Sequence, residues 1–277
     1  MIFTLGFSPC PNDTFIFDAL VNKKIDTEGI EFKVQLEDVQ TLNELAINDT
    51  LDLTKISYGV LPLVLKNYLV MQSGSALGSG VGPLLVAKEL YSSEEIEDCK
   101  VAIPGENTTA HMLFKMAYPG VKNKVYKRYD QIEGFVLEDC VEGRAGVIIH
   151  ENRFTYQEKG LKKIVDLGEY WEEKTGSPIP LGGIIGKRSI DKTLLKKVDS
   201  LIKNSIEYAF EQYPNLNDYI RLHSQEMSKD VMRKHIDLYV NKYSLSLGTI
   251  GMSAIEQFMM INKTSYEADD TSSTFLV

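Results

Sequence analysis

Residues 6–17 read GFSPCPNDTFIF and join an apolar extended segment to a helical one. The preceding stretch, residues 2–7 (IFTLGF), has the short apolar pattern of a buried strand, and the residues that follow have helical periodicity. Pro11 cannot continue a strand, and Asn12 or Asp13 is suited to cap the helix. The junction therefore places short polar side chains at the carboxyl end of a strand, where ligands bind in open α/β sheets.

Strand-like and helical segments alternate through the first two-thirds of the chain, which predicts an α/β fold with parallel sheets. After Lys187, apolar residues recur at spacings of three and four, so we expect residues 189–240 to be mostly amphipathic helix, with Asp191 or Ser189 as its cap. The end of the chain, residues 268–277, is interpreted as a surface tail. The predicted strands after the first are IEFKVQL, LDLTKIS, YLVMQS, PLLVAK, KVAIPG, AGVIIH, KKIVDLG and LGGIIGK.

Two segments rich in Gly and Pro each precede an extended run. They are residues 78–88 (GSGVGPLLVAK) and 175–187 (TGSPIPLGGIIGK). Segments of this kind suit paired hinge strands between two α/β lobes, and loops within one continuous sheet are the alternative. We favour hinges because the local pattern changes after each segment.

Composition narrows the class of protein. Of the 277 residues, 43% are hydrophobic, enough for a sizeable core, and the net charge of −9 argues against nucleic-acid binding. Cys10, Cys99 and Cys140 show no CxxC spacing, so we expect a reducing compartment and no metal site. No apolar run reaches about 18 residues, and no basic leader precedes the first apolar residues. We therefore expect a cytoplasmic protein with no membrane partner.

Further polar groups lie at other strand ends. Lys55 and Ser57 combine a cation and a hydroxyl where a strand gives way to a helix, although surface Lys and Ser are abundant. Thr108 and Thr109 open a helix, where N–H groups and two hydroxyls at the positive end of the helix dipole suit a carboxylate. An ordinary N-cap is the alternative for these threonines.

His150 follows the short buried run GVII at residues 146–149. An imidazole titrates near neutral pH and can act as a base, but a histidine at a strand end is also commonly an ordinary hydrogen-bonded residue. No cysteine-hydrolase pattern surrounds Cys10, so a buried turn cysteine is favoured over a nucleophile. The remaining histidines lie in helical segments and are weaker candidates: His111, His223 and His235.

Seven blocks, in order along nearly the whole chain, closely resemble the 1,4-dihydroxy-6-naphthoate synthases of the futalosine route to menaquinone. The blocks are GFSPCPNDTFIFDALV, LEDVQTLNELA, LTKISYG, SGSALGSGVGPLLVAK, PGENTTAHMLF, GVIIHENRFTY and VDLGEYWEEKTGSPIPLG. The resemblance implies a two-lobed fold similar to type II periplasmic solute-binding proteins, with a ligand cleft between the lobes. With the hinge segments as boundaries, residues 1–87 and 187–277 form one lobe and residues 88–186 form the other.

The resemblance also implies the chemistry. The family's enzymes are lyases that convert cyclic dehypoxanthinylfutalosine into 1,4-dihydroxy-6-naphthoate and release dihydroxyacetone. No metal or organic cofactor is expected, and the partner is a small-molecule carboxylate substrate. The related chorismate dehydratase and a binding protein without catalysis are the alternatives. The blocks SPCPNDTF and IIHE favour the naphthoate synthase over the dehydratase.

Matching the motifs position by position gives the expected site. The family's general base is the histidine that ends a GLIIHE-type strand, which corresponds to His150. The family's substrate contacts lie in its TKxSY and TTA segments, and further candidates lie in the matching blocks around them. The predicted substrate contacts are Lys55, Ile56, Ser57, Thr108, Thr109, Ala110, Asn12, Asp13 and Thr14.

Overall fold

The computed structural model describes residues 1–224, 228–262 and 273–277. The chain divides into two compact units: the first is Met1–Gly78 with Pro180–Val277, and the second is Ser79–Ile179. The hinge segments place the boundaries at 87/88 and 186/187, whereas the units change at 78/79 and 179/180. The reason lies in strand pairing, because β6 (Leu84–Ala87) joins the sheet of the second unit and β11 (Ile179–Lys187) joins that of the first.

The sheet of the first unit has the strand order β2-β1-β3-β11-β4, with β5 beside β11. β1 runs parallel to β2 and β3, while β11 runs antiparallel to β3 and β4. The sheet is therefore mixed, which corrects the expectation of parallel sheets: β11 brings the chain back in the opposite direction. Its strands are β1 (Ile2–Phe7), β2 (Glu31–Leu36), β3 (Leu53–Ser57), β4 (Tyr68–Val70), β5 (Ala76–Gly78) and β11.

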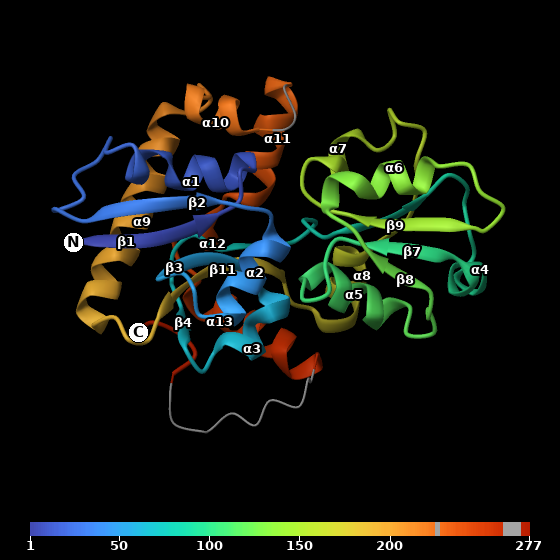
Figure 1. The fold of residues 1–277 in the computed structure, drawn as a ribbon, viewed down its shortest axis with the longest axis horizontal. Helices are drawn as coiled ribbons and strands as arrows, with labels where there is room; N and C mark the ends of the chain where they lie inside the picture. Colours follow the sequence, from blue (N-terminus) through green and yellow to red (C-terminus); the bar gives the residue numbers. More distant parts are fainter. Residues whose placement is uncertain (225–227, 263–272) are drawn as a thin grey trace. The chain divides into compact units, whose positions relative to one another are not determined.

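Helices from both ends of the chain pack together in the first unit. α1 (Pro11–Val21) packs against α9 (Lys192–Gln212), α10 (Asp218–His223) and α11 (Lys229–Tyr239) (Figure 1). The apolar spacing of α9 turns one face inward, and Asp191 caps it by accepting the N–H groups of its first turn. The predicted amphipathic helices and the Asp191 cap are confirmed. The unit also contains α2 (Val39–Ile47), a 3-10 turn (Tyr58–Val60), α3 (Leu61–Val64), α12 (Lys242–Leu245) and α13 (Gly248–Ile261).

The last residues of the chain lie in the first unit. The N–H of Val70 donates to the carbonyl of Thr274, and the N–H of Leu276 donates to the carbonyl of Val70. Phe275 and Leu276 are buried. The predicted surface tail is therefore wrong for these residues, because their apolar side chains join the core; residues 268–272 of that prediction lie outside the described part of the chain.

The sheet of the second unit has the order β10-β6-β9-β7-β8. β7 runs parallel to β8 and β9, and β6 runs antiparallel to β9 and β10. Figure 1 shows α6 on one side of this sheet and α5 on the other. The elements not yet bounded are β7 (Lys100–Ile103), β8 (Lys124–Tyr126), β9 (Arg144–Ile148), β10 (Lys162–Asp166), α4 (Ser93–Asp98), α5 (Thr109–Ala117), a 3-10 turn (Tyr129–Gln131), α6 (Ile132–Leu137), α7 (Asn152–Thr155) and α8 (Leu167–Thr175).

The α/β class predicted from the sequence is confirmed in both units. Each unit carries parallel neighbours whose carboxyl ends meet at one edge of its sheet: β1 with β3 in the first, and β7 with β9 in the second. These two edges hold the residues that the sequence nominated. No helix among the described residues is long and apolar enough to cross a membrane.

Candidate functional site

The helix that follows β1 begins earlier than expected. Cys10, which is buried, is the N-cap of α1, and Pro11 occupies its first turn. Asn12 and Asp13 lie within the helix, so the expected cap by either residue is wrong. The physical reason is Pro11, whose fixed φ is preorganised for the first helical position. The hydroxyl of Thr14 donates to the carbonyl of Cys10 at 3.0 Å, one turn back.

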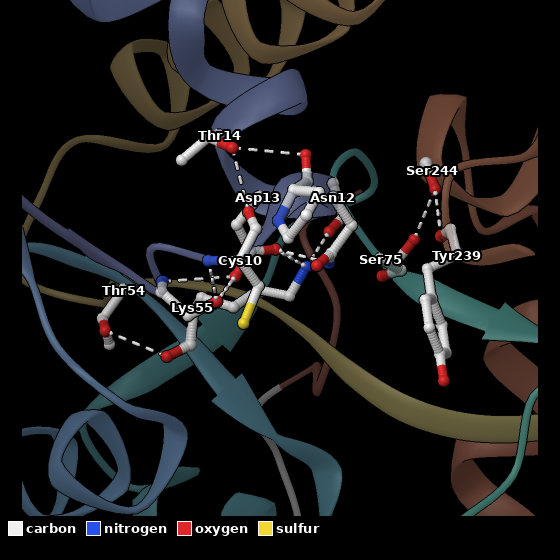
Figure 2. Close-up of polar contacts among 12 residues, drawn as sticks. Cys10, Asn12, Asp13, Thr14, Thr54, Lys55, Ser75, Tyr239 and Ser244 are labelled. Atoms are coloured by element: carbon white, nitrogen blue, oxygen red, sulfur yellow. Dashed lines mark hydrogen bonds and ion pairs between the residues drawn. The ribbon is translucent and has the colours of Figure 1, made fainter. Parts of the chain in front are cut away.

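Asp13 and Lys55 form a buried ion pair at the carboxyl ends of β1 and β3 (Figure 2). Lys55 Nζ lies 3.0 Å from Asp13 Oδ1, and the two side chains are only 7% and 3% exposed. Asp13 also accepts the N–H and hydroxyl of Ser8 at 3.2 and 2.8 Å and the amide of Asn12 at 2.9 Å. The four contacts hold the carboxylate against protein groups.

The ammonium of Lys55 has a second protein acceptor, the carbonyl of Gly74 at 2.8 Å. A lysine ammonium carries three N–H donors, and the described residues supply acceptors for two of them. Lys55 thus keeps one donor beyond its two protein contacts. This donor can bind an anionic or carbonyl oxygen at the strand end.

The end of β3 is fixed from two sides. The N–H of Ser57 donates to Oδ1 of Asn43 at 2.9 Å, and its hydroxyl donates to the carbonyl of Leu181 on β11 at 3.4 Å. Ile56 is fully buried. Ser57 lies two residues after Lys55 on the same strand.

Asn12 joins the ion pair to the C-terminal helices. Its Nδ2 donates to Asp13 Oδ1, and its Oδ1 lies 2.9 Å from Nε2 of His235 on α11. His235 is fully buried. In the first unit, the structure thus brings Asn12, Asp13 and Lys55 into one hydrogen-bonded network.

Several partners of this network were missed by sequence reasoning. They are Ser8, Asn43, Gly74 and His235. Asn43 carried a usable signal, since it is a polar residue on the buried side of α2 beside Leu42 and Ala46. Gly74 carried none, because it contributes only its carbonyl.

In the second unit, Thr108 opens α5 as the sequence predicts. Its side chain accepts the N–H of His111 at 3.2 Å and donates to the carbonyl of Gly105 at 2.9 Å. Thr109 and Ala110 are the first two residues of the helix and are buried. First-turn N–H groups point out of a helix at the positive end of its dipole, which favours a carboxylate there.

His111 braces the loop before α5. Its Nδ1 lies 2.8 Å from the carbonyl of Glu106, and because a carbonyl only accepts, Nδ1 carries the hydrogen in the neutral ring. The ring also packs edge-on against Tyr126. Burial lowers the pKa of His111 below its ordinary value of 6.5, although the hydrogen bond to Glu106 acts in the opposite direction.

His150 lies two residues beyond the end of β9, one residue farther from the strand than the sequence implied. Its φ of 58° falls in the left-handed region, which is uncommon for residues other than glycine. Its half-buried ring packs edge-on against Tyr129, with 4.9 Å between ring centroids and 71° between ring planes. Backbone strain of this kind clusters at functional sites, so the observed φ supports a functional role.

The turn that carries His150 is anchored through α7. Glu133 of α6 accepts Nδ2 of Asn152 at 2.5 Å and pairs with Nζ of Lys159 at 2.6 Å. Arg153 pairs with Asp166 at 2.6 Å. The anchors fix the backbone on the C-terminal side of the histidine.

Parallel pairing places the two nominated segments of this unit at the same edge of its sheet. Thr108, Thr109 and Ala110 follow β7, and His150 follows its neighbour β9. A titratable imidazole and a helix N-terminus therefore share one edge. The arrangement can bind an anion and transfer a proton.

Solved structures define the class of this fold. A protein of Archaeoglobus fulgidus superposes with a TM-score of 0.88 at 28% identity, covering 94% of this chain and 96% of that chain. A Candida albicans protein, described as exhibiting the generic periplasmic binding protein fold, superposes with a TM-score of 0.67 at 14% identity, covering 98% and 92%. The chain has a fold of the periplasmic-binding-protein type, as the sequence resemblance implied.

Sequence relatives narrow the class further. A sequence model described as menaquinone biosynthesis matches residues 3–263. A protein of Thermus thermophilus named 1,4-dihydroxy-6-naphtoate synthase is 44% identical, covering 91% of this chain and 90% of the relative. A Streptomyces coelicolor protein of the same name is 39% identical, covering 91% and 89%. The chain belongs to the menaquinone biosynthesis family, and the resemblance seen in the sequence is confirmed.

Proposed function

We propose that the protein is a carbon–carbon lyase of menaquinone biosynthesis that converts cyclic dehypoxanthinylfutalosine into 1,4-dihydroxy-6-naphthoate and releases dihydroxyacetone. One observation carries the proposal: parallel β7 and β9 place His150 and the N-terminus of α5 at the same sheet edge. The two relatives named for this product support the substrate assignment.

In this proposal, His150 is the general base that starts ring opening and fragmentation. A histidine suits the role because its ordinary pKa lies near neutrality. The edge-on contact with Tyr129 and the anchored turn after it support a fixed ring orientation. Thr108, Thr109 and Ala110 hold the aromatic carboxylate at the α5 N-terminus. Local donors of this kind bind an anion even though the whole chain has a net charge of −9.

The first unit contributes oxygen-binding groups in the same proposal. Lys55 donates its remaining N–H to a substrate oxygen on which negative charge develops, and Ser57 and Ile56 line the same strand end. Asn12, Asp13 and Thr14 are further substrate contacts in this proposal, and their bonds to protein atoms hold them in place. The proposal invokes no metal or organic cofactor, and it includes a cytoplasmic location.

The experiment is a turnover assay with purified protein and cyclic dehypoxanthinylfutalosine, followed by the absorbance of the naphthoate product. General bases contribute about 10²- to 10⁴-fold to rate, so we expect His150→Ala to lower kcat by at least about 100-fold. His223→Ala, on α10 of the first unit, is the matched control and retains the wild-type rate. A wild type that binds the compound without turnover contradicts the enzyme assignment and favours a receptor. Full turnover by His150→Ala contradicts the base assignment alone.

A further inference from the structure

His235 lies on α11, a C-terminal helix to which the proposed reaction assigns no role. Its side chain is fully buried, and its Nε2 lies 2.9 Å from Oδ1 of Asn12 on α1. The two residues are 223 positions apart in the sequence, and their helices pack directly on each other. The contact connects the last third of the chain to the first turn of α1.

The direction of each hydrogen bond in this network follows from chemistry. The carboxylate of Asp13 only accepts, so Asn12 must turn its Nδ2 toward Asp13 Oδ1 and its Oδ1 toward His235. Asn12 Oδ1 is itself only an acceptor, so Nε2 of His235 carries the hydrogen. A flipped Asn12 amide would place its Oδ1 against Oδ1 of Asp13, and neither atom can donate a hydrogen bond. Asp13 and His235 therefore favour the same amide orientation of Asn12, in which Nδ2 faces the carboxylate and Oδ1 faces the imidazole.

The orientation of Asn12 bears on the ion pair because two donors meet at the same atom. Asn12 Nδ2 and Lys55 Nζ both contact Asp13 Oδ1, at 2.9 and 3.0 Å, while Ser8 contacts the other oxygen. Asn12 and Ser8 thus fix the rotation of the carboxylate from its two ends. All of these side chains are buried, where hydrogen bonds are stronger and misplacement costs more than in water.

We propose that His235 is a positioning residue, which acts through Asn12 and Asp13 to hold the Lys55 ammonium in the orientation that binds substrate. The inference rests on the proposed function, in which Lys55 donates to a substrate oxygen. The effect of His235 is exerted through the Asn12 amide.

The test compares two variants of His235 with a packing control. His235→Gln keeps an N–H donor for Asn12, and His235→Phe keeps a ring but has no donor. Met232→Leu, one turn earlier on α11 and also buried, changes packing without removing this hydrogen bond. We expect His235→Phe to lower kcat/KM by about 10- to 100-fold, the usual effect of leaving a buried polar group unpaired, mainly through KM. His235→Gln and Met232→Leu are expected to stay within about threefold of the wild type.

A double substitution separates positioning from general destabilisation. If His235 acts through Lys55, adding His235→Phe to Lys55→Met lowers kcat/KM by less than about twofold further, since the shared interaction is already gone. Additive losses contradict the proposal. It is also overturned if His235→Phe keeps wild-type kinetics, or if His235→Gln loses as much as His235→Phe.

Two further measurements do not require turnover. Long-range ¹H–¹⁵N NMR of the histidine rings is expected to show the Nε2–H form for His235, and the signal is expected to change in Asn12→Ala. The Kd for 1,4-dihydroxy-6-naphthoate, measured by fluorescence, is expected to rise in His235→Phe and not in Met232→Leu. A wild type that binds this product but does not convert cyclic dehypoxanthinylfutalosine overturns the proposed function. The Kd values then still test the role of His235. An Nδ1–H form, or an unchanged Kd, overturns the positioning role.

Discussion

Both side chains of the Asp13–Lys55 ion pair are buried. Substitutions of these two residues therefore test how much a buried ion pair contributes to stability. Removing one partner of a buried pair leaves an uncompensated charge and typically costs about 3–5 kcal/mol. We expect Asp13→Asn and Lys55→Met each to lower the free energy of unfolding by roughly 3 kcal/mol. The double variant is expected to lose at least about 1 kcal/mol less than the sum, because the two sites interact. Urea denaturation followed by circular dichroism measures all three.

An exposed pair in the same unit serves as the control for this prediction. Lys23 and Glu31 lie 2.7 Å apart with side chains 65% and 53% exposed, so solvent screens their attraction. Lys23→Met is expected to change the free energy of unfolding by no more than about 0.5 kcal/mol. Strict additivity of Asp13→Asn and Lys55→Met would show that the pair does not interact energetically.

His111 gives a pH dependence whose sign follows from its lowered pKa. Because burial depresses the folded pKa below the unfolded value of 6.5, the unfolded chain binds a proton between these two values that the folded chain does not. Stability therefore falls as the pH drops below about 6.5, by at most about 1.4 kcal/mol per pH unit. His111→Asn keeps an N–H for Glu106 but cannot titrate. Urea denaturation between pH 7 and 5 is expected to show a shallower loss for this variant; parallel curves would assign the acid sensitivity to other groups.

Local sequence patterns predicted the strands and helices that carry the candidate site. They did not predict which distant residues contact one another there. The polar run after the first strand, the threonine cap of α5 and the histidine beyond β9 were all visible as strand and helix ends. Lys55, the ion-pair partner of Asp13, is 42 positions away, and His235, which contacts Asn12, is 223 positions away. No local sequence pattern contains contacts of this length. The sequence prediction placed the N-cap of α1 at Asn12 or Asp13, whereas Cys10 is the N-cap and the helix begins at Pro11. The prediction gave the capping preference of Asn and Asp more weight than the preference of proline for the first turn.

The pairing of β11 with β3 depends on a glycine that has no room for a side chain. A Cβ at Gly182 would lie 2.5 Å from the carbonyl oxygen of Ile56, a main-chain atom that can retreat only if the strands move apart. We expect Gly182→Ala to lower the free energy of unfolding by about 1–3 kcal/mol, measured by urea denaturation. The strand end at Ile56 and Ser57 should shift as well, so KM for the proposed substrate is expected to rise.

Gly134 in α6 is the matched control for that substitution. Nothing lies within 4 Å of the position a Cβ would take there, and alanine is the better helix former. Gly134→Ala is expected to raise the free energy of unfolding by up to about 1 kcal/mol. A destabilisation equal to that of Gly182→Ala would mean that strand spacing at β11 is not the cause.

The connectivity of the whole chain explains why its two units were harder to delimit than its elements. The glycine- and proline-rich segments do precede strands, but β6 and β11 pair antiparallel in sheets where the sequence predicted parallel order. Periodicity alone identifies a strand and does not say which sheet it enters. The first unit is consequently assembled from both ends of the chain, with α1 packed against α9, α10 and α11.

The same assembly from both ends predicts that the extreme C-terminus stabilises the first unit. Phe275 and Leu276 are buried, and Val70 of β4 exchanges main-chain hydrogen bonds with this segment. Truncating a buried Phe or Leu to alanine typically costs about 2–5 kcal/mol, so we expect Phe275→Ala and Leu276→Ala together to lower the Tm by at least roughly 5 °C. Val277→Ala, next to them but 68% exposed, should leave the Tm within about 1 °C of the wild type. Differential scanning calorimetry measures all three proteins, and equal Tm values for the double variant and the wild type would contradict a role of the C-terminus in the core.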